Sequence, residues 1–177
     1  MATAKKKRPA RHKRTVLTST PSATAWRKIV TSALDWEQAH ASFDAAARDL
    51  ALELQGKRPR GSPHSPWELL EHIRITQGDM LEFMVNPRYE APEWPRTYWP
   101  PSAKPPSERA WDQSVSVIVH DRDELKALTQ RRTLDLTKKI PWGEGQTYLR
   151  TILVAIDHAS YHVGQLILVR KLLDAWD

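Results

Sequence analysis

The chain has 177 residues, a length that suits one domain with a sizeable hydrophobic core. It contains no cysteine, which excludes disulfides, cysteine-ligated zinc, iron–sulfur clusters and a cysteine nucleophile. The net charge is +6 at pH 7, but the basic excess lies at the N-terminus. Residues 1–14 carry seven basic side chains and no acidic one: Lys5, Lys6, Lys7, Arg8, Arg11, Lys13 and Arg14.

Residues 1–22 are predicted to form a disordered tail, basic at first and then rich in Thr, Ser and Pro. Such a tail can bind nucleic acid weakly; we prefer a solvated extension, because no basic patch continues into the rest of the chain. The basic residues are not followed by the apolar region of a secretory signal, and no apolar run is read as membrane-spanning. We expect a soluble, cytoplasmic protein without membrane contact, whose folded domain covers 23–177.

Two helices are predicted in the first half of the domain. Apolar residues recur at helical spacing over 23–54, and glycines and prolines then break the pattern. The second helix covers 65–86. Ser65 is a good N-cap, Pro66 fits the first helical position, and Glu68 completes a capping box.

Residues 87–106 form a long connection that holds seven of the thirteen prolines, together with Trp94, Tyr98 and Trp99. A connection so rich in aromatic residues is expected to be ordered, either as a lid or interface element or as a stiff crossover that covers the core.

Two further helices follow this connection. Ser107 is a candidate N-cap for a third helix over 107–131, and a fourth helix over 147–175 is apolar on most sides, which is typical of a central, buried helix. Four long helices with one long crossover predict an all-α four-helix bundle, a fold that commonly holds metal sites in its core.

A histidine pair near the C-terminus is the strongest functional signal in the sequence. His158 and His162 are four residues apart in the fourth predicted helix, so their side chains share one face. Two imidazoles placed in this way can bind one metal ion. The alternative is two core histidines that form hydrogen bonds with neighbouring carbonyls or carboxylates.

His72, in the second predicted helix, would add a third ligand if its helix faces the fourth one. Three neutral imidazoles leave coordination positions free for water or substrate, as in catalytic rather than structural metal sites. His64 and His120 are interpreted as loop or surface residues.

The chain resembles the DinB/YfiT-like superfamily of four-helix-bundle metalloproteins over residues 26–176. The resemblance rests on three segments, which cover 33–40, 66–73 and 157–165. It implies that His72, His158 and His162 hold a divalent transition metal such as zinc or nickel.

The resemblance also implies a homodimer and, in characterised branches, chemistry with a low-molecular-weight thiol such as mycothiol, bacillithiol or glutathione. The absence of cysteine fits such an external thiol. A metal ion with an open position lowers the pKa of a bound water or thiol. We therefore expect a metal-dependent S-transferase or hydrolase that acts on a small-molecule substrate. The alternative is a non-enzymatic, metal-binding stress-response bundle, in which the ion only fixes the helix packing.

Other polar residues are candidates for roles around the ion. Metal-bound imidazoles usually donate their second N–H to a carboxylate or carbonyl, and Asp44 and Glu71 are candidate acceptors. His40 and Asp44 are four residues apart in the first predicted helix, where they either line a substrate pocket or form a surface ion pair. Gln165 is predicted to orient a substrate or a bound water, and Trp142 to close the mouth of the pocket.

Overall fold

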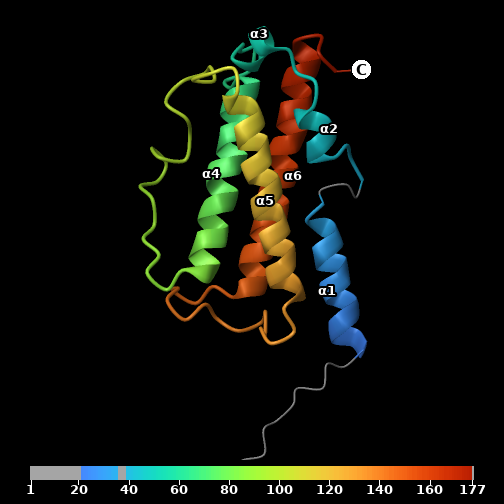
Figure 1. Cartoon of the computed structure of the whole chain (residues 1–177), viewed down its shortest axis with the longest axis vertical. Coiled ribbons are helices and arrows are strands. Elements are labelled where there is room, and N and C mark those ends of the chain that lie inside the picture. Colours follow the sequence, from blue (N-terminus) through green and yellow to red (C-terminus); the bar gives the residue numbers. More distant parts are fainter. Residues whose placement is uncertain (1–20, 36–38, 177) are drawn as a thin grey trace, which may run out of the picture.

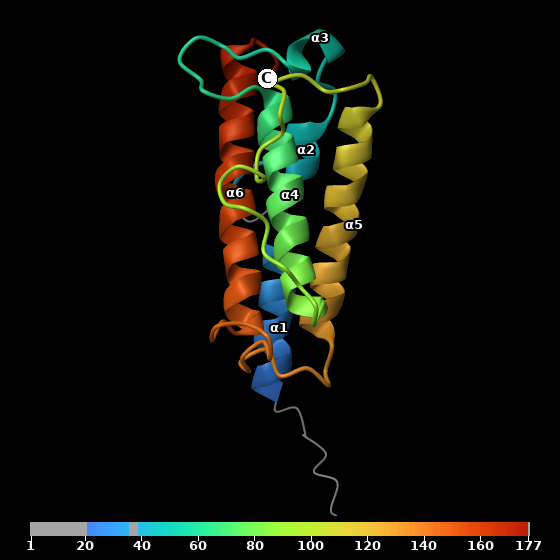
Figure 2. The same ribbon diagram turned by 90° about the vertical axis from the view of Figure 1, so that its left-hand side faces the viewer.

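The computed structural model describes residues 21–35 and 39–176, and this part of the chain is helical without a β-strand, as the sequence predicts. The helices are α1 (Pro21–Ala33), α2 (Phe43–Ala47), α3 (Leu52–Gln55), α4 (Pro66–Val85), α5 (Ala110–Gln130) and α6 (Tyr148–Leu172). α4 packs against both α5 and α6, α1 lies along α5, and α2 lies against α6 (Figure 1, Figure 2). The predicted tail lies outside the described residues, except for its last two positions, which begin α1.

The start of α4 follows the predicted capping box. The Ser65 hydroxyl accepts a hydrogen bond from the Glu68 N–H at 3.2 Å, and the Glu68 carboxylate accepts one from the Ser65 N–H at 2.8 Å. α5 differs from the prediction, because it begins at Ala110 without a side-chain cap and Ser107 contributes only its carbonyl oxygen.

The first predicted helix is wrong as a continuous element. The chain leaves α1 after Ala33, and Ser42 then caps α2 by accepting a hydrogen bond from the Ala45 N–H at 3.1 Å. α2 ends before Arg48, whose backbone is extended, and Asp49 follows with a φ of 55°. The apolar pattern of 23–54 therefore belongs to three helices: α1 packs on one part of the core, and α2 and α3 pack on another.

Two clusters of buried side chains explain this division. The first cluster joins α2 to the N-terminal half of α4 and to the C-terminal half of α6, and includes Phe43, Trp67, Leu70, Ile73, Trp111, Val163 and Leu166. The second cluster joins the end of α1 to the opposite ends of the long helices, and includes Leu34, Met84, Leu125, Leu136 and Ile152. Leu34 and Phe43 thus belong to different clusters, so the apolar pattern of 23–54 serves two parts of the core.

The connection between α4 and α5, residues 87–106, runs along α4 (Figure 1, Figure 2). We call this segment the strap. α4 and α5 run in the same direction, so the connection has to return along the whole length of α4 (Figure 1). Near its end the strap is anchored by the Ser65 hydroxyl, which donates to the Ala103 carbonyl at 2.6 Å. Gly56 permits this approach, since a Cβ there would lie 2.9 Å from the Lys104 Cα.

α6 exposes part of its apolar surface, which differs from the central, buried helix that the sequence predicts. Within the part of the chain that the structure describes, it is the one helix long and apolar enough to cross a membrane by length and composition. This is weak evidence, since a core helix passes the same test. The inward apolar residues of α6, such as Ile152, Val163 and Leu166, pack in the core, whereas others on its outer face are exposed.

We expect Ser65→Ala to lower the free energy of unfolding by about 1–2 kcal/mol, because the change removes a helix cap and leaves the Ala103 carbonyl without its donor. Urea denaturation of the purified protein measures the effect. Ser116→Ala is the control, because the Ser116 hydroxyl is exposed and donates only within α5; its expected effect is below about 0.5 kcal/mol. Equal effects of the two changes would contradict the anchoring role of Ser65.

Candidate metal centre

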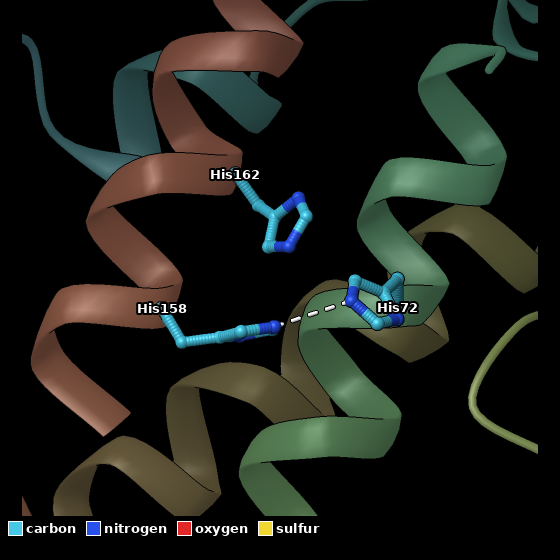
Figure 3. Close-up of side chains that lie close together, drawn as sticks. All are labelled: His72, His158 and His162. Carbon is cyan, nitrogen blue, oxygen red and sulfur yellow. Dashed lines mark hydrogen bonds between the residues drawn. The ribbon is translucent and has the colours of Figure 1, made fainter. Parts of the chain in front are cut away.

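Three histidines from two helices meet on the inner side of the strap. His72 projects from α4, and His158 and His162 project from adjacent turns of α6 toward it (Figure 3). One ring nitrogen from each histidine lies within 4.8 Å of the other two. The Nε2 atoms of His72 and His158 are 3.2 Å apart, within hydrogen-bond distance (Figure 3).

The tautomers of His72 and His158 follow from their oxygen partners. The Nδ1 of His72 lies 2.6 Å from the Tyr98 carbonyl, which can only accept, so this Nδ1 carries the proton. The Nδ1 of His158 lies 3.2 Å from the Thr76 hydroxyl, which already donates to the His72 carbonyl at 2.7 Å. When the hydroxyl accepts from His158, the Nε2 atoms of both rings are left with lone pairs, which is the form that binds a metal. In the other tautomer, His158 donates from Nε2 to His72 across the hydrogen bond drawn in Figure 3.

His162 follows the same pattern. Its Nδ1 lies 2.7 Å from the Gln165 Oε1, an acceptor, so His162 also keeps its proton on Nδ1 and offers Nε2. With these metal-binding tautomers, all three imidazoles direct unprotonated nitrogens into one small space. Lone pairs that face one another repel, and a shared cation removes this repulsion.

The spacing of the nitrogens fits a transition metal. Zinc–nitrogen bonds are about 2.0–2.1 Å, so two nitrogens on neighbouring coordination positions lie about 3 Å apart. The 3.2 Å between the Nε2 atoms of His72 and His158 matches this distance. Metal-binding histidines usually donate their second N–H to an oxygen, as all three do here.

Burial keeps the three rings neutral. Burial and then the neighbouring imidazoles lower the pKa of His158 and that of His162 to about 4, and burial lowers the pKa of His72 as well. A neutral imidazole is the form that binds metal, so near pH 7 the folded protein presents three ligands without first releasing protons.

The strap covers one face of this cluster. The indole of Trp99 stacks on the His72 ring with centroids 3.9 Å apart and planes 2° apart, and its other face stacks on His64 at 4.1 Å. Sequence reasoning missed these roles of Trp99, His64 and Tyr98. The available signal was the aromatic content of the connection, which predicted order but not its position.

The other predicted pocket residues do not all gather here. Asp44 forms an ion pair with Arg122 at 3.1 Å, and Glu71 accepts from Arg74 and from Ser114 on α5. Neither carboxylate serves the histidines, whose acceptors are uncharged oxygens. His40 is exposed and lies before α2, so the expected helical pair with Asp44 does not form.

Gln165 contacts a histidine directly, whereas Trp142 lies elsewhere. Gln165 was predicted to orient a substrate or water; in the structure it holds the His162 ring. Trp142 donates to the Phe83 carbonyl at 2.7 Å and lines a neighbouring cavity of about 480 Å³. This cavity is bounded by α4, α6, the strap and the connection before α6, through residues that include Asp79, Met80, Phe83, Tyr89, Trp142 and Val154.

Comparison with known proteins places the chain in a family. The model of the DinB superfamily matches residues 35–166, a span that contains all three histidines. No curated protein and no solved structure matches the chain significantly.

The three-histidine cluster predicts a pH dependence for the metal-free protein. Between about pH 6.5 and pH 4 the unfolded chain binds protons at His158 and His162 that the folded chain excludes, because burial lowers the pKa of both rings. The free energy of unfolding therefore falls as the pH decreases through this window, by on the order of 1–3 kcal/mol.

Urea denaturation at pH 7 and pH 4.5 in the presence of a chelator measures this loss. Replacing both histidines by glutamine should make the decline shallower, whereas the exposed His120→Gln should leave it unchanged. An identical decline in all three proteins would show that the cluster does not titrate as described.

Proposed function

Because this chain belongs to the DinB superfamily, we propose that it is a four-helix-bundle metalloenzyme whose divalent ion is held by His72, His158 and His162. The observation that carries the proposal is the convergence of three lone pairs whose tautomers are set by three separate oxygens. Structural zinc sites use four protein ligands, whereas three leave room for a reactant. The strap acts as the crossover of the bundle.

A divalent ion held by three neutral imidazoles lowers the pKa of a water or thiol that occupies its open position, which supplies a nucleophile near neutral pH. The chain's own residues prepare this site. Tyr98, Thr76 and Gln165 hold the three Nδ1 protons, so each ring presents Nε2. Trp99 shields one face of His72 from water.

The cavity beside the histidines is the proposed place for a small-molecule substrate. Val154 lies one helical turn before His158 on α6, and Asp79 lies one turn after Thr76 on α4, so the cavity begins about 6 Å along the helices from the cluster. Its volume of about 480 Å³ falls within the range of small-molecule sites. We place the reaction in the cytoplasm and assign it to transfer of a low-molecular-weight thiol or to hydrolysis.

Protein purified without chelators is expected to contain about one transition-metal ion per chain, zinc or nickel, measured by elemental analysis. His158→Ala should lower the metal affinity at least about 100-fold, because one of three ligands is lost. His120→Ala is the matched control, because this histidine is exposed on α5, and it should keep its metal. A full metal complement in His158→Ala would refute the site.

A measurement of substrate turnover distinguishes a metalloenzyme from a bundle that only binds metal. Metal-loaded protein is tested with a panel of small esters and, in the presence of glutathione, mycothiol or bacillithiol, with small electrophiles. Activity that disappears in His158→Ala supports the enzyme. Metal binding without turnover by water or by any thiol supports a bundle in which the ion stabilises the helix packing.

We also propose that the protein is a homodimer. α6 exposes about half or more of several large apolar side chains along one face, and these are Leu153, Tyr161, Leu168 and Leu172. Gly164 lies on the same face with open space beside it, which permits a close approach of a second helix.

Leu168→Glu should convert the dimer into a monomer, because a carboxylate at the centre of this face would be buried without a partner. Light scattering coupled to gel filtration measures the mass in solution. Val117→Glu is the control, since Val117 is exposed on α5, away from this face, and its mass should stay that of a dimer. A monomeric wild-type protein would contradict the proposal.

A further inference from the structure

The strap reaches the histidine cluster through its backbone rather than through a ligand. The Tyr98 carbonyl, in the middle of the strap, accepts the Nδ1 proton of His72 at 2.6 Å. A carbonyl in a connection of this length holds a fixed position only if the connection itself is tied down. The side chains around Tyr98 show how this is done.

Asp79, on α4, holds the strap at two points. Its Oδ1 accepts from the Tyr89 hydroxyl at 2.7 Å, and its Oδ2 accepts from the Tyr98 hydroxyl at 2.8 Å. Burial and the hydrogen bond to Asp79 raise the pKa of Tyr98 to about 12, and burial and Asp79 also raise the pKa of Tyr89. Both hydroxyls therefore stay protonated and donate to a charged acceptor, which gives strong hydrogen bonds.

The same residue of the strap thus makes two contacts with α4. The hydroxyl of Tyr98 binds Asp79, and its carbonyl binds His72, which lies about two helical turns before Asp79 on α4. Trp99, the next residue, is held between the rings of His64 and His72. Loss of the hydrogen bond between the Tyr98 hydroxyl and Asp79 would therefore release both the Tyr98 carbonyl and the Trp99 indole from their positions at His72.

From these contacts we propose that Asp79 is a positioning residue of the metal centre, acting through Tyr98 to set the tautomer and orientation of His72. The inference rests on the proposed metal site and extends it to a carboxylate that touches neither the ion nor a ligand. Outer groups that orient a metal-binding histidine typically change metal affinity by about 10–100-fold when removed.

Linkage makes the coupling reciprocal. If the strap strengthens metal binding, metal binding stabilises the strap by the same factor. The strap offers its own probes, since the Thr97 N–H donates to the Glu93 carbonyl at 3.1 Å and the Tyr98 N–H to the Pro95 carbonyl at 3.2 Å. Hydrogen exchange of these amides should slow when the metal is added.

The test uses Co²⁺ as the probe, because its visible spectrum reports ligand geometry as well as occupancy. Asp79→Ala and Tyr98→Phe should each weaken Co²⁺ binding about 10–100-fold and alter the spectrum at saturation, at temperatures where both variants are folded. In the double variant, Tyr98→Phe should add little to Asp79→Ala, because the contact is already absent. Metal-induced protection of the strap amides should be lost in Asp79→Ala.

Two variants test whether Asp79 acts by orienting His72 or merely by attracting the metal cation with its negative charge. Tyr98→Phe leaves the net charge unchanged. Glu90→Gln removes an exposed charge of the strap, whereas the tyrosine hydroxyls bind Asp79. Wild-type affinity in Tyr98→Phe, or equal losses in Glu90→Gln and Asp79→Ala, would overturn the inference. If the wild-type protein binds no Co²⁺, both the proposed metal site and this inference are wrong. If the wild-type protein binds Co²⁺ and both variants bind it with the same affinity, the metal site stands and only this inference is wrong.

Discussion

Three unprotonated ring nitrogens that face one another are the feature on which the rest of the site depends. Each histidine gives its only ring proton to an oxygen on the far side of the ring: the Tyr98 carbonyl, the Thr76 hydroxyl or the Gln165 amide. The remaining lone pairs converge within a few ångströms, an arrangement that is costly without a cation. α4 and α6 are packed closely enough to impose it.

The three oxygens are all uncharged, which matters for the proposed chemistry. A carboxylate acceptor would make the imidazole more basic and would offset part of the charge of an ion bound to it. Here the carboxylates that the sequence suggested, Asp44 and Glu71, are engaged with other groups. In the proposed centre a divalent ion would keep most of its positive charge for the group in its open position, which favours a lowered pKa there.

The strap is required to connect the parallel helices α4 and α5, and it also forms part of the histidine site. Two neighbouring helices that run in the same direction need a connection as long as the helices themselves, and such a segment usually adds little. In this protein two tyrosine hydroxyls tie it to Asp79, and an indole lies between two imidazoles. The order that aromatic side chains give to a proline-rich segment is thereby used to cover and orient His72.

The sequence by itself determined the elements that depend on local chemistry. The capping box at Ser65 and Glu68 began α4 where predicted, and the spacing of His158 and His162 placed both on one face of α6, because helix geometry relates residues four apart. Periodicity was not enough for 23–54, where the apolar patterns of three separate helices follow one another and look like one. Only the tertiary structure decided the orientation of the rings, because the acceptors Tyr98 and Thr76 lie 26 and 82 residues from the histidines they hold. Such partners are set by how α4, α6 and the strap pack together, and sequence spacing carries no record of that packing.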